Sequence, residues 1–326
     1  MRWIKLHLAW LVCLFQGLHI GNSATATEEP KLPTPVYVGT YINRIFDVNL
    51  RESRFSADFY LWFRWQGDSI KPHETFQMVG GKVDEKTEVQ RKQVGTTNYA
   101  SVRLVSTISK YFDVVDFPLD EQHLKITIEE VIHDGQQMQY FLDGTNSSIS
   151  PTLRFPGWTI VRPRCKAEVT NEIGRSTYGD PTLTEGSKTT RPRFRYEIVA
   201  ARPGYGLFWK MFTGLFIATL LAFLGFFIRV NDVDPRFGLG IGAMFAAVGS
   251  QYITSSLLPD THEIALADRL HILGFLTIFV TLALSTWSLS VYEAGREDES
   301  RRIDRTSFWS LFPIWILLNV LIVIFR

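Results

Sequence analysis

Cysteine is scarce in this 326-residue sequence, which contains only Cys13 and Cys165. Cys13 falls within an N-terminal segment with the features of a secretory signal, so Cys165 would remain alone in the mature chain. No intrachain disulfide is therefore expected. We interpret Cys165 as a half-buried strand residue rather than a reactive thiol. The seven histidines form no metal-ligand set, and neither a metal nor another cofactor is predicted.

A charge excess and the common catalytic motifs are absent as well. The net charge is +1 and no stretch is dense in Lys and Arg, which argues against a nucleic-acid partner. The sequence contains no G-x-S-x-G, H-E-x-x-H or P-loop motif. An exported hydrolase anchored by helices is thus disfavoured, and we do not expect an enzyme.

The N-terminus has the three parts of a secretory signal peptide. Arg2 and Lys5 precede an apolar run over 8–15, and Ala24 and Ala26 complete a cleavage-site pattern. The alternative is a membrane anchor, but the run is shorter than the roughly 20 residues that span a bilayer. Residues 1–26 are predicted to be removed, so that the mature chain begins near Thr27.

Residues 27–203 are predicted to form an all-β sandwich. From about 32 to 196, short alternating segments are bounded by Gly, Pro, Asn and Asp, most clearly at 59–65, 100–109 and 124–128. Such alternation indicates antiparallel strands with one buried face. Many strands in one domain favour a sandwich over a helical or α/β fold.

Residues 204–326 have a different composition, with four apolar stretches at about 204–228, 237–258, 270–292 and 307–325. Each is long enough to cross about 30 Å of hydrocarbon as a helix. The fold class predicted is an extracellular or periplasmic β-sandwich followed by an all-α, four-helix transmembrane domain.

The charges of the connections predict the orientation. The connection at 259–268 is net acidic, whereas the other two carry the arginines Arg229, Arg236, Arg296, Arg301, Arg302 and Arg305. Arginine-rich connections stay in the cytoplasm. We therefore expect a multi-pass protein of the plasma (inner) membrane with the sandwich and the C-terminus outside.

Segment 116–123 reads Asp-Phe-Pro-Leu-Asp-Glu-Gln-His. In a secreted sandwich joined to four spans, this segment resembles the Phe-Pro-x-Asp-x-Gln signature of the Cys-loop receptor superfamily, the pentameric ligand-gated ion channels. Lys110 and Leu124 stand where the eukaryotic members have cysteines, so the chain resembles a prokaryotic branch. The resemblance implies a homopentamer that is surrounded by membrane lipid and conducts ions through a central pore.

The resemblance also implies residues that couple the two domains. Asp120 and Arg202 match positions that form an ion pair at the domain junction, and Phe117 and Pro118 match those that push on Pro259. The acid of the first sandwich turn is either Asp47 or Glu52, and the sequence does not choose between them. The alternative is that these are ordinary exposed charges and a proline that stops a helix.

The second apolar stretch contains a candidate pore face. Residues seven apart lie on nearly one side of a helix, which combines Gly238, Phe245 and Tyr252 with Gly242, Gly249 and Ser256 in one stripe. Alignment on the terminal Leu-Pro places this stripe where the family faces its pore. A ring of Phe245 side chains would form an apolar gate. The alternative is that glycines four apart form a helix-packing face.

Ion selectivity has two conflicting indications. The segment 236–241 resembles the start of the pore helix in anion-conducting members, whereas Asp234 stands near the inner mouth, where cation-conducting members place acids. A ring of carboxylates attracts cations. We favour cations, and we expect Arg236 to point away from the lumen. An anion channel and a non-conducting membrane sensor remain alternatives.

The ligand site is the least defined. Aromatic residues that hold an ammonium group are replaced after the signature by Glu-Glu-Val-Ile-His-Asp-Gly at 129–135, so a classical amine neurotransmitter is not expected. The candidates for a small-molecule agonist are Trp62, Trp65, Glu129, Glu130, His133 and Tyr178, while Trp158 is interpreted as core. Carboxylates beside a histidine could instead sense protons. Sandwich core and solvated loops are the competing interpretations.

Overall fold

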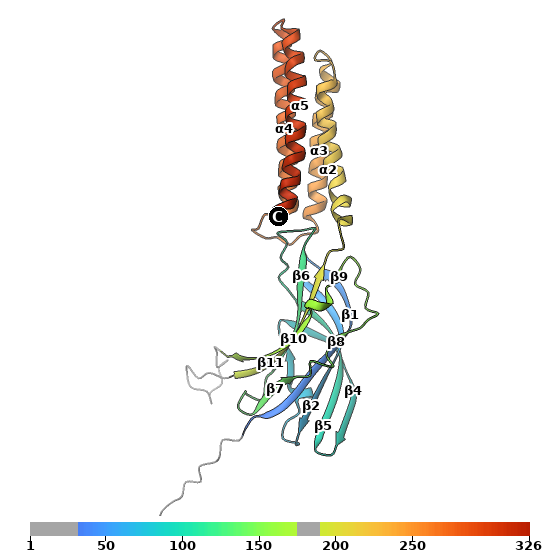
Figure 1. Cartoon of the computed structure of the whole chain (residues 1–326), viewed down its shortest axis with the longest axis vertical. Helices are drawn as coiled ribbons and strands as arrows, with labels where there is room; N and C mark the ends of the chain where they lie inside the picture. Colours follow the sequence, from blue (N-terminus) through green and yellow to red (C-terminus); the bar gives the residue numbers. More distant parts are fainter. Residues whose placement is uncertain (1–31, 175–189) are drawn as a thin grey trace, which may run out of the picture.

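The computed structural model describes residues 32–174 and 190–326. A β domain forms one end of an elongated molecule and four long helices form the other (Figure 1). The predicted signal peptide and Tyr178 lie outside the described residues.

Two sheets make up the β domain. The strand order is β4-β5-β2-β1-β7 in the first sheet, where β8 also pairs with β1, and β10-β11-β6-β3 in the second, where β9 also pairs with β11. The strands are β1 (Thr34–Asn49), β2 (Arg54–Gln66), β3 (Phe76–Met78), β4 (Gly81–Val94), β5 (Thr97–Ser109), β6 (Glu121–Glu130), β7 (Met138–Leu142), β8 (Ser148–Ile149), β9 (Thr159–Ile160), β10 (Lys166–Ile173) and β11 (Thr190–Ala201). Short helical turns occur at α1 (Pro72–Thr75) and η1 (Arg162–Arg164).

The core lies between the sheets and follows the alternation of the sequence. Strand β2 buries every second residue from Phe55 to Trp65, and β6 buries Leu124, Ile126 and Ile128. Each fully buried large apolar side chain contributes about 1.5–3 kcal/mol. The all-β sandwich predicted from the alternation is confirmed.

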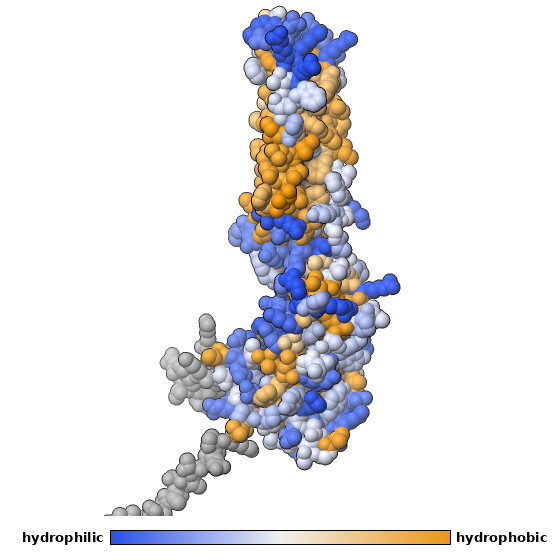
Figure 2. Space-filling model, viewed as in Figure 1, coloured by the Kyte–Doolittle hydropathy of each residue, from blue (hydrophilic) through white to orange (hydrophobic). Residues whose placement is uncertain are grey.

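The second half consists of four helices that are long and apolar enough to cross a membrane. They are α2 (Gly206–Leu224), followed by the short turn η2 (Gly225–Phe227), α3 (Val233–Ser255), α4 (Leu266–Glu293) and α5 (Glu297–Ile324). Figure 2 shows a broad apolar band over these helices, with a polar cap at the end distant from the β domain. The α2–α3 and α4–α5 connections lie at that distant end, and the C-terminus lies near the β domain (Figure 1). The predicted four-helix membrane domain is confirmed.

The helices differ in their bounds from the predicted apolar stretches. The last helix begins at Glu297 rather than near 307, so most of the arginine-rich segment is helical and the α4–α5 connection is short. Acidic residues at 297–299 suit the positive end of the helix dipole, and Glu297 pairs with Arg301 one turn later at 2.6 Å. Hydropathy locates the part of a helix that lies in the hydrocarbon and misses such a polar first turn.

Candidate functional site

The register of two strands builds the junction between the β domain and the helices. Ala201 pairs with Glu121 at the ends of β11 and β6, which places the next residue, Arg202, beside Asp120. Arg202 Nε donates to Asp120 Oδ1 at 3.2 Å, and Asp120 is only 3% exposed. Gln122 Nε2 donates to the other oxygen of Asp120 at 2.8 Å. The structure thus brings together the two residues that the resemblance pairs.

Aromatic rings enclose the Arg202 guanidinium. Its central carbon lies 3.9 Å from the ring centroid of Trp158 and 5.5 Å from that of Phe117. A guanidinium over an aromatic face is attracted by the ring quadrupole. Trp158, interpreted from the sequence as core, is indeed buried, but it also holds this cation. No feature of the sequence pointed to that contact.

Other residues make the hydrogen bonds to the α3–α4 connection and to the first residue of α4. Val115 O accepts from Leu266 N at 2.7 Å, Tyr111 Oη donates to Glu263 at 3.3 Å, and Arg51 Nη1 donates to Ser256 O at 3.4 Å. These contacts come from the turn after β1 and from the segment that precedes the signature. Sequence reasoning missed them, because an exposed Arg or Tyr in a loop carries no distinctive pattern.

The remaining predicted coupling residues are buried near the junction or pair with neighbours in their own turn. Phe117 and Pro118 are buried, and Pro259 is partly buried in the α3–α4 connection. Asp47 and Glu52 both pair with Arg54, at 2.8 and 2.6 Å. The structure therefore places both acids on Arg54 and neither on Arg202.

A lysine lies next to this junction. Lys110 Nζ donates to Tyr111 O at 2.8 Å and to Gln122 Oε1 at 3.2 Å, and so joins the polar group around Asp120. Burial, and secondarily the charge of Lys125, lower the pKa of Lys110 to about 8. Lys110, which the resemblance aligns with a cysteine of the eukaryotic members, is thus a partly buried cation with a lowered pKa.

One face of α3 is uncovered within the chain. Phe245 and Tyr252 are 74% and 77% exposed, and a Cβ added at Gly238, Gly242 or Gly249 would meet open space. The packing glycine of this helix is Gly240, where a Cβ would lie 2.3 Å from Leu282 of α4.

The stripe that the seven-residue spacing predicts is therefore the exposed face of α3. Ser256, just past the helix end, is exposed as well. Within one chain, the glycines of the stripe do not pack against another helix.

The charged residues at the start of α3 point to different surroundings. Asp234 is exposed in the first turn. Arg236 is 1% exposed and donates to both carboxylate oxygens of Asp304 on α5, at 2.8 and 2.6 Å, and to Ile228 O at 3.3 Å. Arg236 is thus turned away from the exposed face and ties the base of α3 to α5.

The acidic ligand candidates fall into two separate environments. Glu130 is fully buried, where it accepts hydrogen bonds from Thr75 Oγ1 at 2.6 Å and from the backbone N–H of Ile132 and His133, and its Oε1 lies 3.1 Å from His133 Nδ1. Glu129, which points to the other face of β6, pairs with Arg193 and Arg191.

The tryptophan candidates also point to opposite faces of their sheet. Trp62 donates from Nε1 to Asp143 at 3.0 Å and packs on Gly39, where a Cβ would lie 2.6 Å from its ring. Trp65 is buried and stacks on His73 with ring centroids 5.4 Å apart. The five ligand candidates that the structure describes, Trp62, Trp65, Glu129, Glu130 and His133, are consequently not all gathered into one site within this chain.

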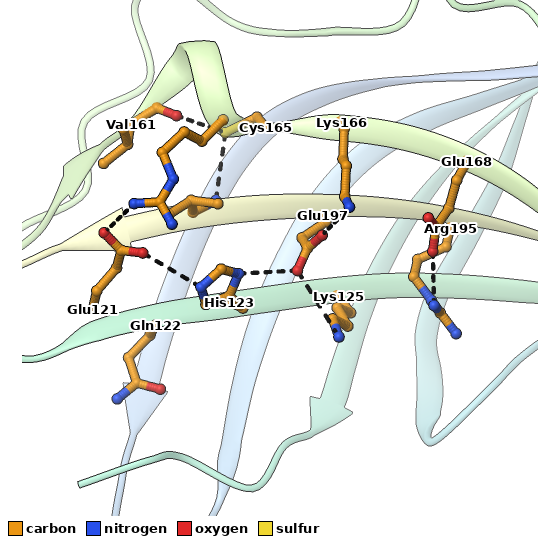
Figure 3. A network of polar contacts seen from close by, with 12 residues as sticks. Glu121, Gln122, His123, Lys125, Val161, Cys165, Lys166, Glu168, Arg195 and Glu197 are labelled. Atoms are coloured by element: carbon orange, nitrogen blue, oxygen red, sulfur yellow. Dashed lines mark hydrogen bonds and ion pairs between the residues drawn. The ribbon is translucent and has the colours of Figure 1, made fainter. Parts of the chain in front are cut away.

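A polar network covers the outer face of β6, β10 and β11 (Figure 3). Glu197 lies 3.0 Å from His123, 3.5 Å from Lys166 and 3.9 Å from Lys125. Burial alone would raise the pKa of Glu197, but the hydrogen bond with His123 and the two lysines outweigh it, so the pKa lies below its ordinary value.

Cys165 lies at the edge of the network, between η1 and β10, where Val199 N donates to its Sγ at 3.4 Å. Burial raises the pKa of this thiol, which keeps it protonated. That state agrees with the interpretation of Cys165 as a structural residue.

Comparison of the sequence with protein-family models and with curated proteins gives no match. The architecture, a two-sheet β domain followed by four apolar helices, is consistent with that of a pentameric ligand-gated channel subunit. The resemblance at the level of residues rests on segment 116–123 and on the contacts described above.

Proposed function

We propose that this chain is one subunit of a homopentameric, ligand-gated ion channel in which α3 lines the pore. The carrying observation is the exposed face of α3 with Gly238, Gly242, Gly249, Tyr252 and Ser256, on a helix that belongs to a membrane domain. Polar side chains such as those of Tyr252 and Ser256 are better accommodated beside a water-filled space than beside hydrocarbon, and the stripe glycines leave room for that space. Five copies around an axis would supply that space.

The β domain would act as the sensor, with a small molecule or protons as the stimulus. Its connection to the pore runs through Asp120 and Arg202 and through the hydrogen bonds to the α3–α4 connection. Such a device shifts an equilibrium between closed and open states and performs no chemical reaction. The arginines at the distant ends of the helices support a cytoplasmic location for those ends, with the β domain and the C-terminus outside.

Cation conduction is the favoured selectivity because Asp234 is exposed at the distant end of α3 while Arg236 is neutralised by Asp304. A ring of five carboxylates would then face the mouth of the pore without an opposing ring of guanidinium groups. The buried Arg236 weakens the argument for an anion channel that its position in the sequence suggests.

The decisive experiment uses purified full-length protein. We expect a pentameric mass by native mass spectrometry, and currents in planar bilayers that depend on pH or on a screened ligand and that reverse near the cation potential in a salt gradient. A monomeric or dimeric mass would contradict a pore formed by five copies. Pentamers that stay silent under all stimuli would favour a non-conducting sensor.

A further inference from the structure

The segment between β5 and β6, residues 110–120, is a part of the β domain that contacts the helices, and we refer to it as the junction loop. Val115 O accepts a hydrogen bond at 2.7 Å from the backbone N–H of Leu266, the first residue of α4. Tyr111 Oη donates to Glu263 of the α3–α4 connection at 3.3 Å. The conformation of the junction loop therefore decides whether these contacts to the helices are made.

Lys110 is the first residue of the junction loop, and its ammonium group contacts both ends of the loop. Nζ donates to Tyr111 O at 2.8 Å and to Gln122 Oε1, on β6, at 3.2 Å. It also lies 4.8 Å from the ring centroid of Phe112, which is fully buried. A cation over an aromatic face is attracted by the ring quadrupole. These contacts join the start of the loop to the strand that follows it.

Gln122 extends this closure to the rest of the junction loop. It is buried, and its Nε2 donates to Asp113 O and, at 2.8 Å, to the carboxylate of Asp120. Asp120 in turn accepts from Arg202 at the entry to α2. Because the side-chain amide of Gln122 has its oxygen on Lys110 and its nitrogen on these two residues, a change at Lys110 alters a contact shared by the whole loop.

The ammonium group of Lys110 is held by neutral oxygen atoms and has no carboxylate within ion-pair distance among residues 32–174 and 190–326. Three charged groups face it: Asp113 and Asp120 of the junction loop, and Lys125 of β6. Burial, followed by repulsion from Lys125, lowers the pKa of Lys110 to about 8, and the two carboxylates offset only part of this. In an opened loop the side chain would be surrounded by water, and its pKa would return toward the ordinary 10.5.

The opened loop thus binds a proton more tightly than the closed loop, so a fall in pH favours opening and a rise in pH favours closure. We propose that Lys110 is a proton-operated clasp: its neutral amine keeps the junction loop closed on the helices, and its protonated form favours opening. The neutral amine retains N–H donors for Tyr111 O and Gln122 Oε1 without the cost of a buried charge. The clasp depends on the folded β domain and does not require that the chain conducts ions.

The test measures hydrogen–deuterium exchange of detergent-solubilised full-length protein at pH 7 and pH 9, with each rate corrected for the intrinsic exchange rate at that pH. Peptides that contain residues 111–120 and the start of α4 report opening of the junction loop. With a pKa of about 8 in the closed loop and 10.5 in the opened loop, we expect about tenfold less opening at pH 9 than at pH 7. Equal opening at the two pH values would overturn the clasp.

Two substitutions fix the charge at this position in opposite states. Lys110→Gln stays neutral and should keep the loop protected at both pH values, whereas Lys110→Arg stays charged and should leave it equally open at both. The matched control, Lys92→Gln at an exposed position of β4, should keep the response of about tenfold. The same response in Lys110→Gln would assign the titration to another group and overturn the proposal, and this variant decides the question alone if the larger arginine prevents folding.

Discussion

At the scale of single residues, the surroundings of Lys110 have a consequence for the response to pH. Its ammonium group is partly buried beside Gln122, and burial lowers its pKa to about 8. Between that value and the ordinary pKa of 10.5, the unfolded chain binds a proton that the folded chain has released. Folding stability therefore rises with pH in this window, and below it the burial cost is present in full.

Lys110→Met should abolish this contribution. The unmodified chain is expected to gain at most about 1.4 kcal/mol per pH unit between pH 8 and 10.5 from this group, and the variant should lose that slope. The measurement is the thermal midpoint of detergent-solubilised protein against pH. Lys92→Met, at an exposed position of β4, should keep the slope. Parallel curves for the unmodified chain and Lys110→Met would show that Lys110 does not titrate in this range.

At the scale of elements, α3 has two faces with different surroundings. Its buried face carries Gly240, Ala243 and Ala247 against neighbouring helices, and its base is held by the Arg236–Asp304 pair. The opposite face leaves Phe245 and the stripe glycines uncovered. Changes on the two faces should consequently give different phenotypes.

Breaking the Arg236–Asp304 pair is expected to destabilise the membrane domain. Arg236→Leu or Asp304→Leu alone leaves a buried charge without its partner, which costs about 3–5 kcal/mol, whereas the double variant should regain much of that loss. The free energy of unfolding in a double-mutant cycle checks this. Arg301→Gln, which breaks an exposed pair with Glu297, should cost less than about 1 kcal/mol. Additive losses from the two leucine variants would contradict a coupled pair.

Phe245→Ala should alter conduction rather than folding. Because Phe245 is largely exposed within the subunit, its truncation leaves no cavity in the chain, and a wider apolar ring should leak without stimulus. Phe212→Ala, on a side chain fully buried on α2, should instead cost about 3–5 kcal/mol and lower the yield. Gel filtration and current without stimulus separate the two. Well-assembled Phe245→Ala pentamers that stay closed would exclude Phe245 as the gate and leave Tyr252 or Ile241 as the candidates.

At the scale of the whole molecule, the β domain and the helices meet through few polar contacts. The main-chain bond from Leu266 to Val115 is the shortest of the three that reach the α3–α4 connection or the first residue of α4. The Asp120–Arg202 pair, enclosed by Trp158, lies where β11 leads into α2. The polar contacts between the two parts, among the described residues, are therefore concentrated in this small group.

Asp120→Asn or Arg202→Gln is expected to leave the pentamer assembled and to shift the activation midpoint by about fivefold or more, equivalent to about 1 kcal/mol of coupling. The double variant Asp120→Arg/Arg202→Asp, which swaps the two charges, should reverse part of this shift. Arg164→Gln, which breaks the neighbouring exposed pair with Glu121, should shift activation little. Unchanged activation curves in both single variants would remove the junction from the mechanism.

In the proposed pentamer, selectivity would be a property of the assembly, since it would depend on a ring of charges that one chain cannot form. Asp234→Ala removes up to five carboxylates from the mouth of the pore and should shift the reversal potential away from the cation value. Asp298→Ala, exposed in the first turn of α5, should leave it unchanged. A reversal potential of the unmodified channel at the chloride value would show that it conducts anions.

Local patterns in the sequence determined the architecture. Alternation over strands such as β2 and β6 predicts a sandwich, because each strand needs only its own residues to define a buried face. Apolar length predicts the four helices for the same reason. The seven-residue spacing on α3 likewise predicts which residues share a face, and that face is the exposed one.

The tertiary structure alone decided which partners the charged and aromatic residues find. Arg236 meets Asp304 across 68 positions of the chain, and Trp158 stacks on Arg202, although neither contact has a local signature. The sequence also did not predict the polar first turn of α5, because hydropathy detects contact with hydrocarbon and not helical hydrogen bonding. Glu129 and Glu130 are adjacent in the sequence, yet the pleat of β6 sends them to opposite faces and separates their chemistry.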